Sequence, residues 1–245
     1  MLLDKKCILN CTDVFFDYLK EFTQKEVLIG SYTCDNYFVK LLDYMNDDKI
    51  VFESYDLVVP ILSEENTSIF DSFCFEKIAR KANQIVVNDY GTLKYLSSLD
   101  YSCRLGRLLF HQYRDLRYSE VENRHVEVGC FEIINILRNQ GCIIDAIEID
   151  LVSVDMDIKD EIDVYVHYPY RLLSVTRICE FCGELHKDGI KFSPEQKCDF
   201  QCMDVYMKIS DTNCFKRGKG VYEKLSEKYD SLCKGKNIIS MEELA

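Results

Sequence analysis

Two kinds of hydrophobic pattern alternate along this chain. Short runs of apolar and β-branched residues, such as residues 27–31 (VLIGS), predict buried strands. Longer stretches in which apolar residues recur every three or four positions, such as residues 37–45, predict amphipathic helices. A regular alternation of strands and helices favours βα units and a parallel sheet.

The same two patterns predict the remaining elements. Further strands are predicted at residues 6–11, 50–52 or 57–61, 84–88, 103–109, 143–151 and 163–168, with short pieces at 204–209 and 214–216. Further helices are predicted at residues 13–22, 68–82, 92–98, 131–139 and 221–233. With strands and helices alternating in this way, the simplest architecture is a TIM-type (β/α) barrel, complete or else irregular or incomplete, formed by one α/β domain over residues 1–245. A doubly wound open sheet is the alternative.

The overall composition is that of a soluble globular protein, with 47% apolar and 29% charged residues. The 30 basic and 42 acidic residues give a net charge of -12, which argues against broad binding to nucleic acid or to anionic membranes. No apolar run reaches the length of a membrane span. The first residues, MLLDKKCILNCTD, lack an apolar core of signal-peptide length, so we expect a cytoplasmic protein.

Thirteen cysteines are many for a chain of this length, and in a reducing compartment they are more often ligands, reactive thiols or core residues than disulfides. Four of them, Cys179, Cys182, Cys198 and Cys202, lie in a cysteine-rich loop at residues 176–203, spaced as C-x2-C and C-x3-C. Thiolates are the ligands that select zinc and iron–sulfur clusters. This spacing therefore predicts a bound metal without deciding between the two.

Polar side chains near two strand ends are candidates for chemistry. His167 ends the run DVYVH, and at the end of a barrel strand it would act as a general acid or base, or as a substrate donor. The alternative is a hydrogen-bonded structural histidine. Glu148 and Asp150 alternate on IEIDL and so share one face, where they would bind substrate or a metal, or share a proton. The alternatives are a solvent-exposed strand end or pairing with arginine.

A basic segment runs from Arg104 to Arg117, beginning within the strand predicted at residues 103–109. Arg104, Arg107 and Arg114 supply guanidinium groups, whose fork geometry matches carboxylate and phosphate, so they are candidates for binding an anionic substrate. The alternative is a set of structural salt bridges in an acidic protein. The sequence contains no P-loop, G-x-G-x-x-G, H-E-x-x-H or nucleophile elbow, so a nucleotide-driven enzyme or a classical protease has no motif support.

Three phrases together resemble the collagenase-like peptidase U32 family. They are VNDYGTLKYL at residues 87–96, RLGRLLFHQYRDLRY at 104–118 and VYVHYPYRLLSVTRIC at 164–179. The likeness extends over residues 27–209. The resemblance includes the branch with the ubiquinone-biosynthesis proteins UbiU and UbiV and the RNA-hydroxylation proteins, which are similar in carrying a 4Fe–4S cluster.

That resemblance implies a set of cluster ligands in this chain, namely Cys34, Cys179, Cys198 and Cys202. Cys34 ends GSYTC, which matches a G-E-x-x-C phrase of the family with Ser31 in place of the glutamate. Cys182 is an additional cysteine and the alternative fourth ligand. The C-x2-C spacing alone favours Cys182, whereas the family motif favours Cys34.

The resemblance also implies a function. We expect an oxygen-independent redox step such as a hydroxylation, acting on a small-molecule or peptide substrate, with a paralogous U32-type partner subunit. His167 and Arg177 are the expected catalytic residues, and Arg177, two residues before Cys179, is placed to hydrogen-bond cluster sulfurs or a carboxylate. The alternative is a U32-type peptidase or a binding module with a structural zinc site, in which the same cysteines would stabilise the fold.

Overall fold

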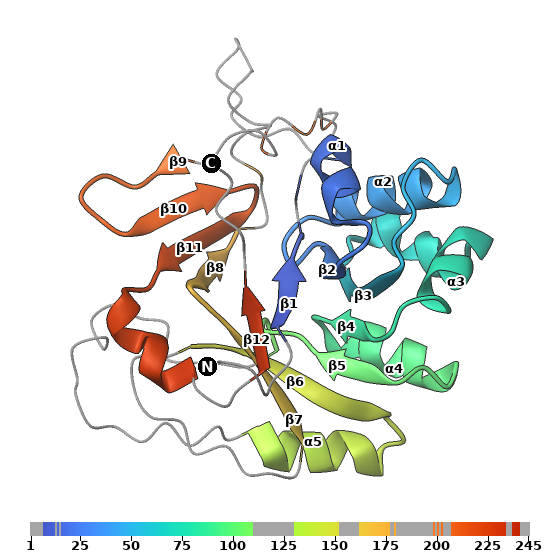
Figure 1. The fold of residues 1–245 in the computed structure, drawn as a ribbon. Helices are drawn as coiled ribbons and strands as arrows, with labels where there is room; N and C mark the ends of the chain where they lie inside the picture. The colour runs from blue at the N-terminus through green and yellow to red at the C-terminus, as the bar shows by residue number, and fades with distance from the viewer. Residues whose placement is uncertain are drawn as a thin grey trace.

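A closed barrel of eight parallel strands forms the centre of the described part of the chain (Figure 1). The computed structural model describes residues 7–12, 14, 16–109, 130–151, 162–176, 179, 198, 200, 202, 207–233 and 237–240 of the 245. Around the barrel the strands follow the order β1-β12-β7-β6-β5-β4-β3-β2. The predicted TIM-type barrel is confirmed, and the open-sheet alternative is wrong because β12 pairs with both β1 and β7 and closes the ring.

The barrel strands are short, and all pair in parallel. Their bounds are β1 Cys7–Asn10, β2 Glu26–Gly30, β3 Ser54–Val59, β4 Ile85–Val87, β5 Cys103–Leu105, β6 Ile144–Asp150, β7 Asp163–His167 and β12 Asn237–Ser240.

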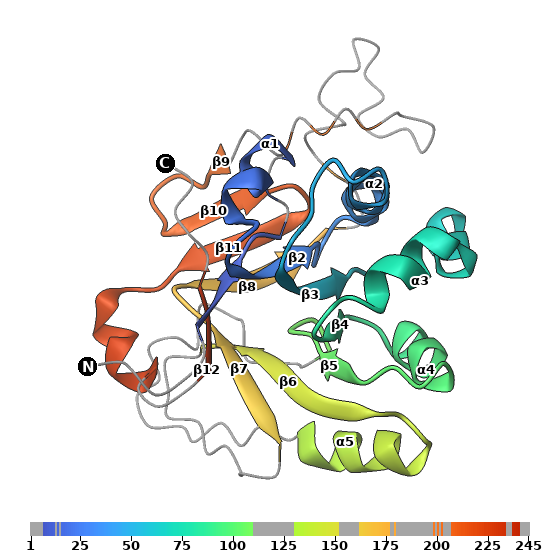
Figure 2. The same cartoon turned by 45° about the vertical axis from the view of Figure 1, so that its right-hand side comes forward.

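Helices cover the outside of the barrel. Their bounds are α1 Phe16–Leu19, η1 Lys20–Phe22, α2 Asp35–Asn46, η2 Glu64–Asp71, α3 Phe73–Ala79, α4 Tyr90–Ser98, α5 Cys130–Asn139 and η5 Glu227–Cys233. Figures 1 and 2 show α2, α3, α4 and α5 following one another around the barrel. No helix in the part of the chain that the structure describes is long and apolar enough to cross a membrane.

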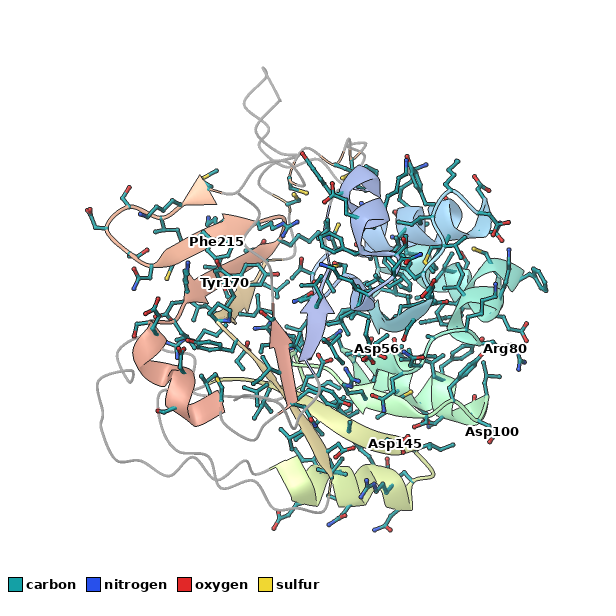
Figure 3. The ribbon with its side chains drawn as sticks, in the orientation of Figure 1. Asp56, Arg80, Asp100, Asp145, Tyr170 and Phe215 are labelled. Carbon is teal, nitrogen blue, oxygen red and sulfur yellow. The ribbon has the colours of Figure 1, made fainter. Side chains whose placement is uncertain are left out.

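A second, antiparallel sheet lies on the other side of the barrel from α2, α3 and α4 (Figure 1). Its strands are β8 Tyr170–Val175, β9 Met207–Lys208, β10 Cys214–Arg217 and β11 Gly220–Lys224, in the order β8-β11-β10-β9. Aromatic rings pack on it: the centroids of Tyr170 and Phe215 are 5.4 Å apart. Figure 3 shows these two residues together on this sheet, whereas Asp56 lies among the barrel strands.

Three of the predicted elements are corrected by the structure. Strand β3 spans residues 54–59, so it begins after the alternative at 50–52 and overlaps the first part of the one at 57–61. The helix predicted at 68–82 is divided, because the Ser72 side chain accepts a hydrogen bond from Phe75 N at 3.1 Å and starts α3 as its N-cap. The helix predicted at 221–233 is wrong in its first half, since residues 220–224 form β11 between β10 and β8.

Strand alternation divides the buried side chains into two groups. Outward-facing residues such as Ile29 and Val166 pack against the helices in one large apolar cluster. Inward-facing residues such as Leu28, Val58 and Tyr165 form a smaller apolar cluster inside the barrel. The same inner faces also carry charged side chains, which form the first part of the candidate site.

Candidate functional site

Arg104 is the centre of a fully buried charge cluster inside the barrel. Its guanidinium contacts Asp56 Oδ2 at 2.7 Å and Glu148 Oε1 at 3.2 Å, and none of the three side chains is exposed. The guanidinium also donates from Nε to Gln84 Oε1 at 2.8 Å and lies 3.7 Å from the ring centroid of Tyr165. Strands β3, β5 and β6 each supply one charge, so the cluster depends on their order around the barrel.

Glu148 connects this cluster to the carboxyl end of the barrel. Its Oε2 atom accepts a hydrogen bond from the Tyr32 hydroxyl at 2.5 Å and lies 3.1 Å from His167 Nε2. Burial by itself would raise the pKa of Glu148. The hydrogen bond from His167, the charge of Arg104 and the hydrogen bond from Tyr32 outweigh it and hold the pKa below its usual value. Glu148 is therefore an ionised carboxylate in this setting.

The contacts of His167 define its tautomer. Arg107 Nη1 lies 3.1 Å from His167 Nδ1, and a guanidinium can only donate, so Nδ1 is the acceptor. The ring proton is therefore on Nε2, which donates to Glu148 Oε2. Burial, reinforced by the positive charge of Arg107, lowers the pKa of His167 to about 4. His167 is neutral at pH 7, beside an ionised carboxylate and a protonated tyrosine.

Arg107 and Asp150 form a second buried ion pair at the same end of the barrel. Arg107 also donates from Nη2 to the Tyr170 carbonyl at 3.1 Å, and Asp150 Oδ1 accepts from Leu172 N at 3.0 Å. These bonds join the barrel to β8 at the start of the antiparallel sheet. Glu148 and Asp150 do share the inner face of β6, paired with arginine rather than exposed.

Two of the three arginines expected to bind a substrate form ion pairs within the protein. Arg104 and Arg107 both bind carboxylates within the protein, the arrangement expected of structural salt bridges, and substrate binding by them stays a prediction. His167 lies at the carboxyl end of β7, as expected, and its catalytic role also stays a prediction. Arg114 and Arg177 lie outside the described residues.

Cys34 lies just beyond β2, at the same edge of the barrel. Gly30 ends the strand with φ +113°, and a Cβ there would lie 2.1 Å from the Val58 carbonyl oxygen, so this close approach to β3 requires glycine. Ser31 Oγ then accepts hydrogen bonds from Thr33 N at 3.0 Å and from Cys34 N at 2.7 Å. Ser31 thus positions the Cys34 backbone, and Cys34 is the N-cap residue of α2.

The turn between β10 and β11, Gly218–Lys219, lies against the segments that carry the other cysteines. A Cβ on Gly218 would lie 3.8 Å from Cys202 Sγ and 4.0 Å from Thr33 Oγ1. Lys219 interacts electrostatically with the thiols of Cys34 and Cys179. The segments that carry three of the four expected cysteines therefore lie close to one two-residue turn, although Cys34 and Cys202 are 168 positions apart (202 − 34).

The fourth expected ligand is Cys198, and the alternative ligand is Cys182. Cys198 is half-buried, and Cys182 lies outside the described residues. Cys34 and Cys202 are buried in the large apolar cluster, and Cys179 packs against it. Within the part of the chain that the structure covers, no three His, Cys, Asp or Glu side chains are grouped closely enough to hold a metal ion.

The donor chemistry nevertheless fits a thiolate-bound metal centre. Cysteine sulfur is the ligand type that both zinc and iron–sulfur clusters accept, and two of the thiols are buried away from competing water. Helix α2, 12 residues long, begins next to Cys34, and the Lys219 ammonium pairs with Asp35, the residue that follows this cysteine.

Comparison with known proteins adds no relative to this description. None of the family models, curated proteins or solved structures compared with the chain matches it. The functional argument therefore depends on the site geometry and on the motif resemblance.

Several residues of the site were not predicted from the sequence, among them Asp56 and Gln84, which contact Arg104, and Tyr32, Asp35 and Lys219. Tyr32 lies within GSYTC, where its neighbour Cys34 drew attention instead, and Asp35 directly follows that cysteine. Lys219 lies in RGKG, where glycine on both sides of one residue is a turn signal. That signal predicts a hairpin but not which surface the hairpin contacts.

Proposed function

We propose that this chain is an iron–sulfur protein of the U32 peptidase-like family that carries out an oxygen-independent redox step, such as a hydroxylation. Its substrate is a small molecule or peptide, and it acts with a paralogous partner subunit. The observation that carries the proposal is the meeting of the Cys34, Cys179 and Cys202 segments at the turn Gly218–Lys219. This meeting point follows the carboxyl end of β2, and active sites of TIM-type barrels lie at that face.

In this proposal each group has a distinct part. Cys34, Cys179, Cys198 and Cys202 hold a 4Fe–4S cluster, with Cys182 as the alternative to Cys34. The cluster, when bound, supplies electrons one at a time. His167 keeps a proton on Nε2, and Arg107 orients its ring through Nδ1.

In this proposal, the contacts of Tyr32, His167 and Glu148 would support proton transfer to or from a substrate. The Tyr32 hydroxyl and His167 Nε2 both point at Glu148 Oε2, and the two donors are 3.3 Å apart. A substrate oxygen admitted beside them would meet a neutral acid, a carboxylate and a fixed guanidinium without bulk water. Arg114 would bind anionic groups of the substrate, and Arg177 would hydrogen-bond the cluster sulfurs or a carboxylate.

The test is purification without oxygen, followed by a visible spectrum and assays for iron, sulfide and zinc. About four iron and four sulfide per chain, with the broad visible absorption of a cluster, supports the proposal. Cys198→Ala should lose the iron without unfolding. Cys34→Ala and Cys182→Ala identify the fourth ligand. Cys74→Ala is the matched control, because Cys74 lies in α3 and donates to the Leu42 carbonyl at 3.4 Å.

A structural zinc site is the second candidate. The cysteines lie where the barrel meets the turn of the antiparallel sheet, so a metal there would join the two parts. A colourless protein with about one zinc per chain, which unfolds when a chelator removes the metal, would replace the redox proposal with this one. The peptidase or binding function would then have to be sought at the barrel face.

A further inference from the structure

The turn Gly218–Lys219 is held rigidly against the cysteine segments. Arg217 and Gly220 pair across the hairpin, and Gly218 takes φ +55° at the first turn position, as in a type II′ turn. The Lys219 carbonyl accepts hydrogen bonds from Thr176 N at 2.8 Å and from Thr176 Oγ1 at 3.3 Å. Thr176 is three residues before Cys179, so the backbone of Lys219 is tied directly to that ligand's segment.

The side chain of Lys219 is tied to the segment of a second cysteine. Its Nζ lies 3.2 Å from Asp35 Oδ1, and Asp35 directly follows Cys34. The other oxygen of Asp35 accepts from Ser63 N at 3.1 Å and from Asn66 Nδ2 at 2.9 Å, so the carboxylate cannot turn away. The Lys219 side chain is 18% exposed and that of Asp35 is 7%, which limits screening by water.

We propose that Lys219 is the positively charged residue that sets the reduction potential of the metal centre held by Cys34 and Cys179. The inference rests on the proposed function, because it requires a redox-active cluster at these cysteines. Asp35 acts as the positioning residue, since it holds the ammonium between the two cysteine segments.

The physical reason is the charge change on reduction. A cluster bound by four thiolates is anionic, and one added electron makes it more negative without breaking a bond. A fixed ammonium nearby stabilises the reduced form more than the oxidised form. For a charge about 10 Å away at an effective dielectric constant of about 20, the ratio of reduced to oxidised cluster changes roughly tenfold. For a one-electron couple that ratio corresponds to about 59 mV.

The experiment is redox titration of the anaerobically purified full chain, followed by its visible spectrum, with iron content and circular dichroism measured in parallel. Lys219→Met should keep its iron and show a midpoint potential lower by roughly the tenfold ratio. Lys219→Arg, which keeps the charge, should stay close to the wild type. Lys94→Met makes the same change in net charge on the exposed face of α4 and should leave the midpoint unchanged.

The outcomes separate this inference from the proposed function. A wild-type chain with zinc and no cluster overturns both. A cluster whose midpoint is the same in the wild type and in Lys219→Met leaves the function standing and overturns the role of Lys219. If Lys219→Met and Lys219→Gln both stay folded but lose iron, Lys219 retains the metal instead of tuning it, and the inference is again overturned.

Discussion

The barrel interior and the cysteine edge are adjacent but are assembled by different means. Inside the barrel, Asp56 and Glu148 both pair with Arg104 from neighbouring or near-neighbouring strands, so strand order alone brings them together. At the edge, Cys34, Cys179 and Cys202 come from segments outside the strands and meet at a hairpin turn of the second sheet. We therefore expect the barrel interior to stabilise the fold and the cysteine edge to bind a metal or another group.

The charged residues that face into the barrel depend on one another. Burying unpaired charge costs far more than burying a hydrogen-bonded ion pair, so each member of the interior cluster is needed by the others. At the edge, loss of one thiol would remove a proposed ligand but leave no buried charge behind. Variants in the two regions should therefore separate unfolding from loss of metal.

The largest effect is expected for Arg104→Met. It leaves Asp56 and Glu148 buried without their cation and should lower the free energy of unfolding by about 3–5 kcal/mol, measured by urea denaturation. Arg80→Met is the control, because Arg80 pairs with Glu76 on the exposed face of α3 and should change little. An equal fall in the free energy of unfolding of both variants would show that the buried charge cluster stabilises the fold no more than an exposed ion pair does.

The next effect is a pH dependence from His167, which is packed against Tyr32, Arg107 and Glu148. Its pKa in the folded protein is about 4, below the ordinary 6.5, so the unfolded chain binds a proton first as the pH falls. Stability should be constant above about pH 6.5 and fall by up to about 3 kcal/mol as the pH approaches 4.

The measurement is urea unfolding of the wild type and of His167→Gln across this range. Glutamine has no proton to gain, so the stability difference between the two proteins should change as the pH falls from about 6.5 towards 4. The lowered pKa of Glu148 adds a loss of stability at still lower pH, where its carboxylate is protonated. A difference that stays constant with pH would show that His167 titrates normally.

Tyr32→Phe should have an intermediate effect that reaches both regions. It removes the 2.5 Å hydrogen bond to Glu148, for which we expect a loss of about 1–2 kcal/mol, since His167 and Arg104 still satisfy the carboxylate. Because Tyr32 also anchors the loop that carries Cys34, metal content should fall as well. If the free energy of unfolding falls as expected but the metal content is unchanged, the two regions are independent.

The smallest effect on stability is expected for Ser31→Ala. The variant loses two hydrogen bonds to the backbone that leads into α2, for which we expect about 1 kcal/mol. Its effect on metal retention should be larger, because the Cys34 backbone is no longer positioned. Ser98→Ala, which removes an exposed hydroxyl near the end of α4, is the control and should retain all its metal.

Local pattern predicted the parts of this molecule whose cause is local. The apolar runs of β2, β4, β6 and β7 and the amphipathic face of α2 were all identified, because burial of one face imposes a period of two or 3.6 residues. The closing strand β12 was missed. Only two of its residues, Ile238 and Ile239, are apolar, and it is held by pairing with β1 and β7.

The sequence by itself determined the α/β alternation, the inner faces shared by Glu148 with Asp150 and by Tyr165 with His167, and the position of Cys34 just beyond a strand. Only the tertiary structure decided that Arg104 binds Glu148 and Asp56, and that Lys219 lies beside the cysteine segments. The reason is that periodicity sets which way a side chain points, whereas its partner depends on strand order and on contacts between segments far apart in the chain.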